Sequence, residues 1–243
     1  WWFWRCWWMP RPEPSSQEIA HGTTSAAADG TFDIQFTAKP DTSVLEDSET
    51  TFRYTVYADV TDTTGETRSA QRTLNVGYTA LAASMSAEHW LTDTDPVEIR
   101  IRTTTLDGEG QQANCVMKIV AVEQPERTTR SPLSDPRYDW RHEEDPQPDP
   151  TNPNSWPLGE QVFETEIETD AAGNAKVATK LAAGMYRAKL ATKDRFGKSV
   201  TAELPLQVLD PDARKLNLRI PNLYNAPKSS MQPGDKYLAV WGS

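Results

Sequence analysis

The sequence predicts an all-β protein built from tandem antiparallel β-sandwich domains of the fibronectin or immunoglobulin type. Two observations lead to this prediction. A strand–turn–strand pattern occurs twice in the chain, and most other apolar residues fall in short alternating segments between polar turns, with almost no helical periodicity. Many short strands separated by turns are typical of a sandwich, because each strand buries one face against a second sheet.

The two copies of the pattern align without a gap. In each copy a tyrosine precedes an Asp-x-x-Gly turn by eight residues, and a valine follows the glycine of that turn by eleven. The aligned residues are Tyr54, Asp62, Gly65 and Val76 in the first copy and Tyr186, Asp194, Gly197 and Val208 in the second. Equal spacing on both sides of the turn indicates that the copies form the same structure.

Each copy is predicted to be a β-hairpin, because its apolar residues alternate on both sides of the turn. Successive side chains of a strand point to opposite faces, so alternation indicates a half-buried strand. The apolar face of the first copy comprises Phe52, Tyr54, Val56, Ala58, Val60, Leu74, Val76 and Tyr78. The apolar face of the second comprises Tyr186, Ala188, Leu190, Val200, Ala202, Leu204, Leu206 and Val208.

The residues Asp62, Gly65, Asp194 and Gly197 are interpreted as structural turns and not as a functional site. An aspartate side chain can accept a hydrogen bond from the backbone two residues further on, and glycine adopts positive φ without steric cost. We therefore expect a positive φ at one or both of these glycines.

Further strands are predicted around the two hairpins. Turns at Asp29-Gly30 and at Gly173-Asn174 are each expected to join a strand pair, with Phe32, Ile34 and Phe36 after the first turn and Val177 and Leu181 after the second. The other predicted strands carry Val97, Ile99 and Ile101; Val116, Lys118, Val120 and Val122; Leu216, Leu218 and Ile220; and Leu238, Ala239 and Val240. These elements predict the back half of a domain over 1–78, a complete domain over 79–210 and the start of a further domain over 211–243.

Residues 123–158 interrupt the strand pattern. Eight prolines lie in this stretch, at positions 125, 132, 136, 146, 148, 150, 153 and 157. Proline has no backbone N–H donor, so a chain with so many prolines cannot join a sheet ladder. The stretch is predicted to be an insertion that leaves the sandwich of the 79–210 domain.

Composition excludes several classes of function. The net charge of −10 comes without a basic patch, which argues against a nucleic-acid partner. No apolar run approaches the roughly 20 residues of a transmembrane helix. The start of the chain lacks the features of a signal peptide, so any export signal is expected to lie outside this fragment. Cys6 and Cys115 fall in different predicted domains, and no disulfide between them is expected.

No catalytic, cofactor or metal site is predicted, and we expect that the chain is not an enzyme. His142-Glu143 begins like a zinc-protease motif, but Pro146 stands where the second histidine is needed. The run 93–95, Asp-Thr-Asp, begins like a calcium loop without the later ligands, and is interpreted as a turn before a strand. The three histidines, His21, His89 and His142, are far apart in sequence and are expected at the surface.

A block of tryptophans at the start of the chain has two interpretations. Five of the nine tryptophans are Trp1, Trp2, Trp4, Trp7 and Trp8. In the favoured interpretation one aromatic face belongs to a core and the other packs on a neighbouring domain. In the alternative, the exposed rings form a contact surface that stacks on sugars or binds a protein.

Three segments of the chain resemble macroglobulin domains of bacterial alpha-2-macroglobulin-like proteins. They are the run 57–67 (YADVTDTTGET) with its return at 75–78 (NVGY), the run 19–22 (IAHG) that leads into 29–34 (DGTFDI), and the run 184–187 (GMYR) with 193–197 (KDRFG). The resemblance implies tandem macroglobulin-like sandwich domains in a large protein of the cell envelope. Such a protein would be periplasmic or on the outer surface, and secreted or lipid-anchored through the full-length parent.

That family entraps proteases after they cleave a bait segment, and many members form an internal thioester at a Cys-x-Glu-Gln motif. Here Cys115 is followed by Val116, Met117 and Lys118, so the thioester motif is absent. The resemblance therefore implies a non-catalytic structural fragment of the inhibitor scaffold. Its partners would be neighbouring domains of the parent chain and, through the parent, proteases. Two alternatives are an adhesive or glycan-binding module that uses the tryptophan block, and a structural repeat of a cell-surface fibre.

The proline-rich insertion also has two interpretations. It could be a bait segment, because Arg127, Arg130, Arg137 and Arg141 offer protease sites on an extended backbone. It could instead be a structural strap, with Tyr138, Trp140 and Trp156 anchoring it to the sandwich while the prolines limit the entropy lost on ordering. The strap is the favoured interpretation, because the resemblance places the bait in a later domain.

Overall fold

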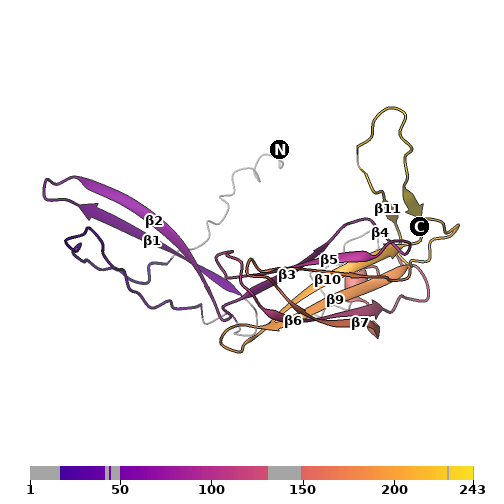
Figure 1. Cartoon of the computed structure of the whole chain (residues 1–243), viewed down its shortest axis with the longest axis horizontal. Coiled ribbons are helices and arrows are strands. Elements are labelled where there is room, and N and C mark those ends of the chain that lie inside the picture. The colour runs from indigo at the N-terminus through magenta and orange to yellow at the C-terminus, as the bar shows by residue number, and fades with distance from the viewer. Residues whose placement is uncertain (1–16, 42–43, 45–49, 131–148, 229, 243) are drawn as a thin grey trace, which may run out of the picture. The chain divides into compact units, whose positions relative to one another are not determined.

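A computed structural model describes residues 17–41, 44, 50–130, 149–228 and 230–242 (Figure 1). The chain divides into two compact units, Trp1–Val76 and Gly77–Ser243. In the described residues the regular structure is almost all strand, with a 3-10 turn (η3) at Pro153–Ser155 in the second unit, and one strand pair among those described is parallel. The predicted all-β antiparallel sandwich fold is confirmed.

The first unit contains the first predicted hairpin. Strands β1 (Thr51–Thr61) and β2 (Thr67–Gly77) form a two-stranded sheet. Exposed and half-buried residues alternate over residues 51–59 of β1, as the sequence predicts, but Val60 and, on β2, Val76 of the predicted apolar face are exposed. Tyr54 lies on the half-buried face, where its ring contacts Phe36 with centroids 5.9 Å apart and its hydroxyl donates to the Lys39 carbonyl at 2.8 Å. The hairpin therefore takes support from the chain that precedes it.

The predicted strand at Phe32, Ile34 and Phe36 is wrong. The turn before it does form, since Ala27 N–H donates to the Thr31 carbonyl at 2.8 Å and Gly30 has a φ of 82°. Residues 31–41 nevertheless contain no strand. A strand needs a neighbour to bond its backbone, and in the described part of this unit the two strands pair with each other.

The second unit is a sandwich of a three-stranded and a five-stranded sheet (Figure 1). The smaller sheet has the order β3 (Ala82–Ala87), β5 (Val97–Thr104), β8 (Asn174–Thr179). The larger has the order β4 (Leu91–Thr92), β10 (Ser199–Leu209), β9 (Gly184–Lys193), β6 (Asn114–Val122), β7 (Leu158–Glu168). Neighbours are antiparallel except β4, which is parallel to β10.

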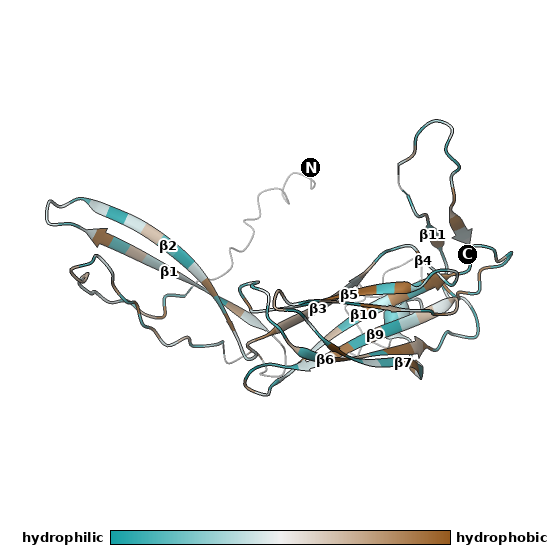
Figure 2. Cartoon of the chain, viewed as in Figure 1, coloured by the Kyte–Doolittle hydropathy of each residue, from teal (hydrophilic) through white to brown (hydrophobic). Residues whose placement is uncertain are grey.

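The second predicted hairpin, β9–β10, supplies much of the sandwich core. It is an unbroken antiparallel ladder that begins with the pair Ser199 and Lys193. The main core cluster draws its buried side chains from both sheets: Val97, Ile99 and Ile101 of the smaller, and Cys115, Met117, Ile119, Tyr186, Ala188, Leu190, Leu206 and Val208 of the larger. Figure 2 shows the corresponding mixture of apolar and hydrophilic residues along the strands.

The strand predicted at Val116–Val122 forms as β6, but the inner face suggested for it is wrong. On β6 the core face carries Cys115, Met117 and Ile119, whereas the sequence pattern suggested Val116, Lys118 and Val120. The suggested face carries the charged Lys118, whereas residues 115, 117, 119 and 121 are all apolar, so the alternation itself identifies the inner face and the prediction overlooked it. A bulge opposite β7 then shifts the register and turns Val122 inward.

The turn at Gly173-Asn174 does not join a strand pair. It links β7 of the five-stranded sheet to β8 of the three-stranded sheet, so it crosses from one layer of the sandwich to the other. Leu181, predicted as part of a strand, lies beyond β8 and is buried in the main core.

Several apolar residues of 211–228 and 230–242 pack on the second unit's sandwich. The strand predicted at Leu216–Ile220 is wrong, because the strands among the described residues here are β11 (Leu223–Asn225) and β12 (Val240–Gly242). The strand predicted at Leu238–Val240 begins only at its last residue. Leu218 and Ile220 instead belong to a second core cluster with Val122, Trp156, Met185 and Leu209. The predicted domain boundaries at 78 and 210 stay predictions.

The described ends of the proline-rich insertion are held against the sandwich. Trp156 is only 5% exposed, and its indole N–H donates to the Pro150 carbonyl at 2.8 Å. Arg187 of β9 donates to the Asn154 carbonyl at 2.7 Å. This anchoring by Trp156 agrees with the strap interpretation. Tyr138, Trp140, Arg137 and Arg141 lie outside the described residues.

No helix in the described ranges is long and apolar enough to cross a membrane.

Candidate functional site

The predicted turn residues adopt the same geometry in both hairpins. In each turn one oxygen of the aspartate, Oδ1, accepts from the backbone N–H groups two and four residues further on. The distances are 2.7 and 3.0 Å at Asp62 and 2.9 and 2.9 Å at Asp194. Gly65 has a φ of 88° and Gly197 a φ of 81°, so the predicted positive φ is confirmed at both.

The turn at Asp170 repeats this geometry, although the sequence analysis did not single out that aspartate. Its Oδ1 accepts from the backbone N–H groups of Ala172 at 2.9 Å and Asn174 at 2.8 Å. The signal was available, because Asp170 precedes Gly173 by the same three residues that separate Asp62 from Gly65. One local turn design therefore serves both a hairpin and a crossing between sheets.

Asp194 has a third backbone partner that Asp62 lacks. Its second oxygen, Oδ2, accepts from the Ala80 N–H at 2.8 Å, and the residue is only 6% exposed. The hydrogen bonds to the carboxylate, with the Ala80 N–H foremost, hold the pKa of Asp194 below its ordinary value of 3.8, although burial opposes them. Lys198 of the same turn lies over the Tyr78 ring, 5.8 Å from its centroid. These two contacts hold residues 78–80, which lie just before β3, against the turn.

The side chains with nucleophilic or metal-binding chemistry do not converge in the described residues. Cys115 is buried in the core, and burial raises the pKa of its thiol. His21 and His89 are exposed, as predicted, and His142 lies outside the described residues. No group of three or more His, Cys, Asp or Glu side chains that could hold a metal ion occurs in the described part of the chain.

The run 93–95 forms the turn that leads into β5. Thr92 donates its hydroxyl to Asp95 at 3.3 Å, and the Asp93 N–H donates to the Leu209 carbonyl at 3.0 Å. These bonds fit the predicted turn before a strand.

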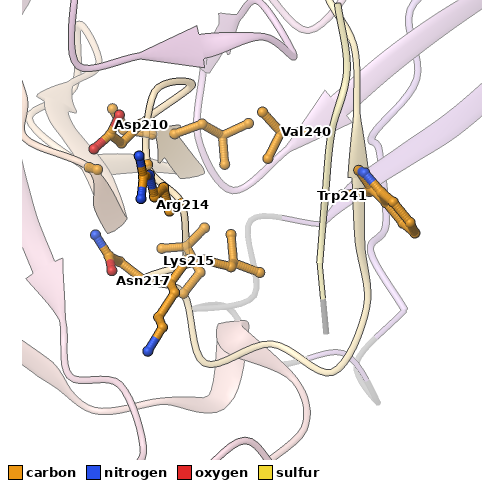
Figure 3. Close-up of a pocket in the computed structure, with 12 residues that line it drawn as sticks. Asp210, Arg214, Lys215, Asn217, Val240 and Trp241 are labelled. Atoms are coloured by element: carbon orange, nitrogen blue, oxygen red, sulfur yellow. The ribbon is translucent and has the colours of Figure 1, made fainter.

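A small cavity lies beside the second core cluster (Figure 3). Its volume of about 80 Å³ holds a few water molecules and is well below the roughly 300 Å³ at which ligand pockets begin. Figure 3 shows Asp210, Arg214 and Asn217 on one side of the cavity, and the Trp241 ring directed away from it. The cavity does not accommodate a substrate of ordinary size.

An exposed aromatic pair stands on the short hairpin β11–β12. Tyr224 and Trp241 lie directly opposite each other in the ladder, and they are 70% and 83% exposed. The Tyr224 hydroxyl is hydrogen-bonded to that of Tyr237. Trp241 is the most exposed large hydrophobic side chain in the described part of the chain, and the sequence analysis missed the pair.

The sequence analysis had placed its aromatic contact surface at the other end of the chain. Trp1, Trp2, Trp4, Trp7 and Trp8 all lie outside the described residues. Their contact surface therefore stays a prediction.

No model of a known protein family matches the chain, and no curated protein matches it.

Proposed function

We propose that the chain is a non-catalytic part of the scaffold of a bacterial alpha-2-macroglobulin-like protease inhibitor in the cell envelope. The observation that carries the proposal is the duplicated hairpin. β1 and β9 both end one residue before the turn aspartate, and β2 and β10 both begin five residues after it. Duplication of one structural unit within a chain supports an architecture built from repeated sandwich domains.

The chemistry of the sandwich also favours a supporting role. Its inner faces are filled by apolar side chains, and charged residues on the outer face of the larger sheet pair across strands. Lys118 lies 3.1 Å from Glu164, and Lys189 lies 3.0 Å from Glu203. The most buried carboxylate, that of Asp194, accepts backbone hydrogen bonds and so holds the fold. Such a unit can hold neighbouring domains in fixed positions relative to each other.

In this proposal the partners are neighbouring domains of the parent chain, and proteases are bound only through the full-length parent. The parent would be periplasmic or on the outer surface, and secreted or lipid-anchored. Entrapment encloses a protease without touching its active site, so cleavage of large proteins should stop while cleavage of small peptides continues. That difference is the assay that tests the proposal.

The test compares three forms of the full-length parent mixed with an active protease: wild type, Leu206→Asp and Val162→Asp. Leu206 is buried in the main core, whereas Val162 is 45% exposed on β7. A buried unpaired charge disrupts the sandwich, so we expect Leu206→Asp to lose the block on casein cleavage while Val162→Asp keeps it. Full protection by Leu206→Asp, or no selective block by the wild-type parent, would contradict the proposal.

The adhesive or glycan-binding alternative, as drawn from the sequence, depends on the tryptophan block. It stays a prediction. The same protease assay distinguishes it from the scaffold proposal, because a parent protein that serves only in adhesion would not selectively block the cleavage of large substrates.

A further inference from the structure

We propose that Tyr224 and Trp241 form a binding platform for an uncharged carbohydrate chain. The two residues are direct partners in the β11–β12 ladder, so their side chains leave the same face of the sheet. Side chains at such opposed positions stand roughly 5 Å apart at Cβ, which places the two rings next to each other. Both are largely exposed.

The other face of this hairpin is attached to the sandwich. Leu223 and Val240 point to the opposite side from the aromatic pair and pack on the second core cluster. Gly242 lies close against Leu216, such that an added Cβ would be 3.0 Å from Leu216 Cδ2. The strands therefore sit tightly on apolar side chains, and the platform is held by a packed inner face.

Hydrogen bonds fix one end of the hairpin to the loop after β3. The Asn225 side chain donates to the His89 carbonyl at 2.8 Å, and the His89 ring contacts the Ala226 carbonyl through Nε2 at 3.0 Å. Asn225 directly follows Tyr224, so these bonds also orient the tyrosine. A prepositioned aromatic surface loses little conformational entropy when a ligand binds.

The inner face of the hairpin is packed on the sandwich, and the aromatic face is not. Strand residues alternate between two faces, and here Leu223 and Val240 take the inner positions. Tyr224 and Trp241 lie on the opposite face, which is exposed in the described part of the chain.

The surroundings of the pair select the ligand class. A shallow hollow beside it is lined by Asn222, Leu223, Tyr224, Trp241 and Gly242, none of which is charged. Aromatic faces carry negative partial charge, which suits the axial C–H groups of a pyranose ring. The Asn222 amide and the tyrosine hydroxyls can exchange hydrogen bonds with sugar hydroxyls. A protein partner is less well matched, because the residues that dominate protein–protein binding lie at the desolvated centre of a broad contact area. The hollow beside Tyr224 and Trp241 is open and partly polar.

The test is isothermal titration of the full chain with four neutral hexasaccharides: cellohexaose, chitohexaose, laminarihexaose and maltohexaose. The variants are Trp241→Ala, Tyr224→Ala and, as a matched control, Phe196→Ala, whose ring is 71% exposed in the β9–β10 turn. We expect at least one sugar to bind the wild type, with affinity about tenfold lower in Trp241→Ala and unchanged in Phe196→Ala. Because Trp241 is exposed, its variant should keep the wild-type melting temperature.

A further variant separates this platform from the tryptophan block. With Trp1, Trp2, Trp4, Trp7 and Trp8 all changed to Ala in the full chain, binding should persist. The proposal is overturned if no hexasaccharide binds, if binding survives both Trp241→Ala and Tyr224→Ala, or if it depends on the block alone. Sedimentation that shows Trp241-dependent self-association without sugar binding would also overturn it and assign the surface to a second copy of the chain.

Discussion

The two hairpins share a turn and strand limits but differ in what their inner faces carry. Leu74 and Val76 on β2 match Leu206 and Val208 on β10 in the alignment of the repeat. Nearer the turn the match ends. The positions of Val200 and Leu204 on β10 are taken on β2 by arginines 68 and 72. Val200 is buried, whereas Arg68 is 84% exposed.

This difference separates what makes a hairpin from what makes a core. An aspartate, a glycine at positive φ and alternating side chains produce the turn and the strands in both copies. Burial depends on a few inward positions, because an unpaired guanidinium cannot enter a sandwich core without a large desolvation cost. The arginines of β2 therefore keep the turn end of the first hairpin in water.

The strand neighbours of the hairpins differ accordingly. β9 is paired on both sides, by β6 and β10, while β1 and β2 form a sheet of two strands in the described part of the first unit. Two-stranded hairpins alone are marginally stable in water. The contacts of Tyr54 with Phe36 and Lys39 supply part of the missing support.

The largest expected difference between the copies comes from matched leucines. Leu206→Ala removes a side chain from the packed core, and we expect it to lower the free energy of unfolding of the sandwich by about 3 kcal/mol. Leu74→Ala, at the equivalent half-buried position, should cost less than about half as much. Urea denaturation followed by circular dichroism measures both. Equal losses would mean that the first hairpin is buried as deeply as the second.

A smaller effect should be the same in both copies. Gly65→Val and Gly197→Val each force a β-branched residue to positive φ, at a cost of about 1–3 kcal/mol. No atom lies within 4 Å of a Cβ added at either glycine, so the cost comes from backbone conformation and not from crowding. Melting temperatures of the two variants, each compared with its Ala counterpart, measure it. An unchanged melting temperature in both valine variants would refute the equivalence of the turns.

The parts of the fold that follow from local chemistry could be predicted from the sequence. Asp194 and Gly197 identify a turn on their own, and alternation on both sides of it identifies the strands. The strand at Phe32–Phe36 was wrong because strand formation requires a partner, which no local pattern reveals. The inner face of β6 was wrong because the prediction relied on Val116 and Val120 and overlooked the charged Lys118 between them, although the opposite face is apolar without interruption.

The candidate site was less predictable for a related reason. β11 and β12 contain three residues each, which is too short for an alternating pattern to stand out. The pairing of Tyr224 with Trp241 depends on a register across the long connection between Asn225 and Val240, which no short turn motif sets. Likewise, nothing local to Asp194 indicates that its second oxygen accepts from Ala80. Pairings over long distances set the positions of these groups.

The smallest expected effect concerns acid and compares the two turn aspartates. The pKa of Asp194 is held below 3.8, so its ionised form stabilises the fold. That contribution is complete above about pH 4 and is lost as the pH falls through the lowered pKa of the folded state. We therefore expect the wild-type sandwich to lose stability between about pH 4 and pH 2 more steeply than Asp194→Asn, which has no proton to bind at this position.

The comparison with Asp62→Asn makes the acid test specific to the sandwich. The pKa of Asp62 is also lowered, first by its hydrogen bond from the Thr64 hydroxyl, but Asp62 is exposed and belongs to the first unit. Other carboxylates with lowered pKa, such as Glu98 and Glu164, titrate equally in wild type and variants, so they cancel in the difference. Urea denaturation followed by circular dichroism at each pH measures the stability of the sandwich. In Asp194→Asn the stability of the sandwich should depend less on pH, and in Asp62→Asn its pH dependence should be that of the wild type. The reason is that only Asp194 joins its turn to the backbone of Ala80. If both variants followed the wild-type curve, the bond to Ala80 would contribute nothing to the stability of the sandwich.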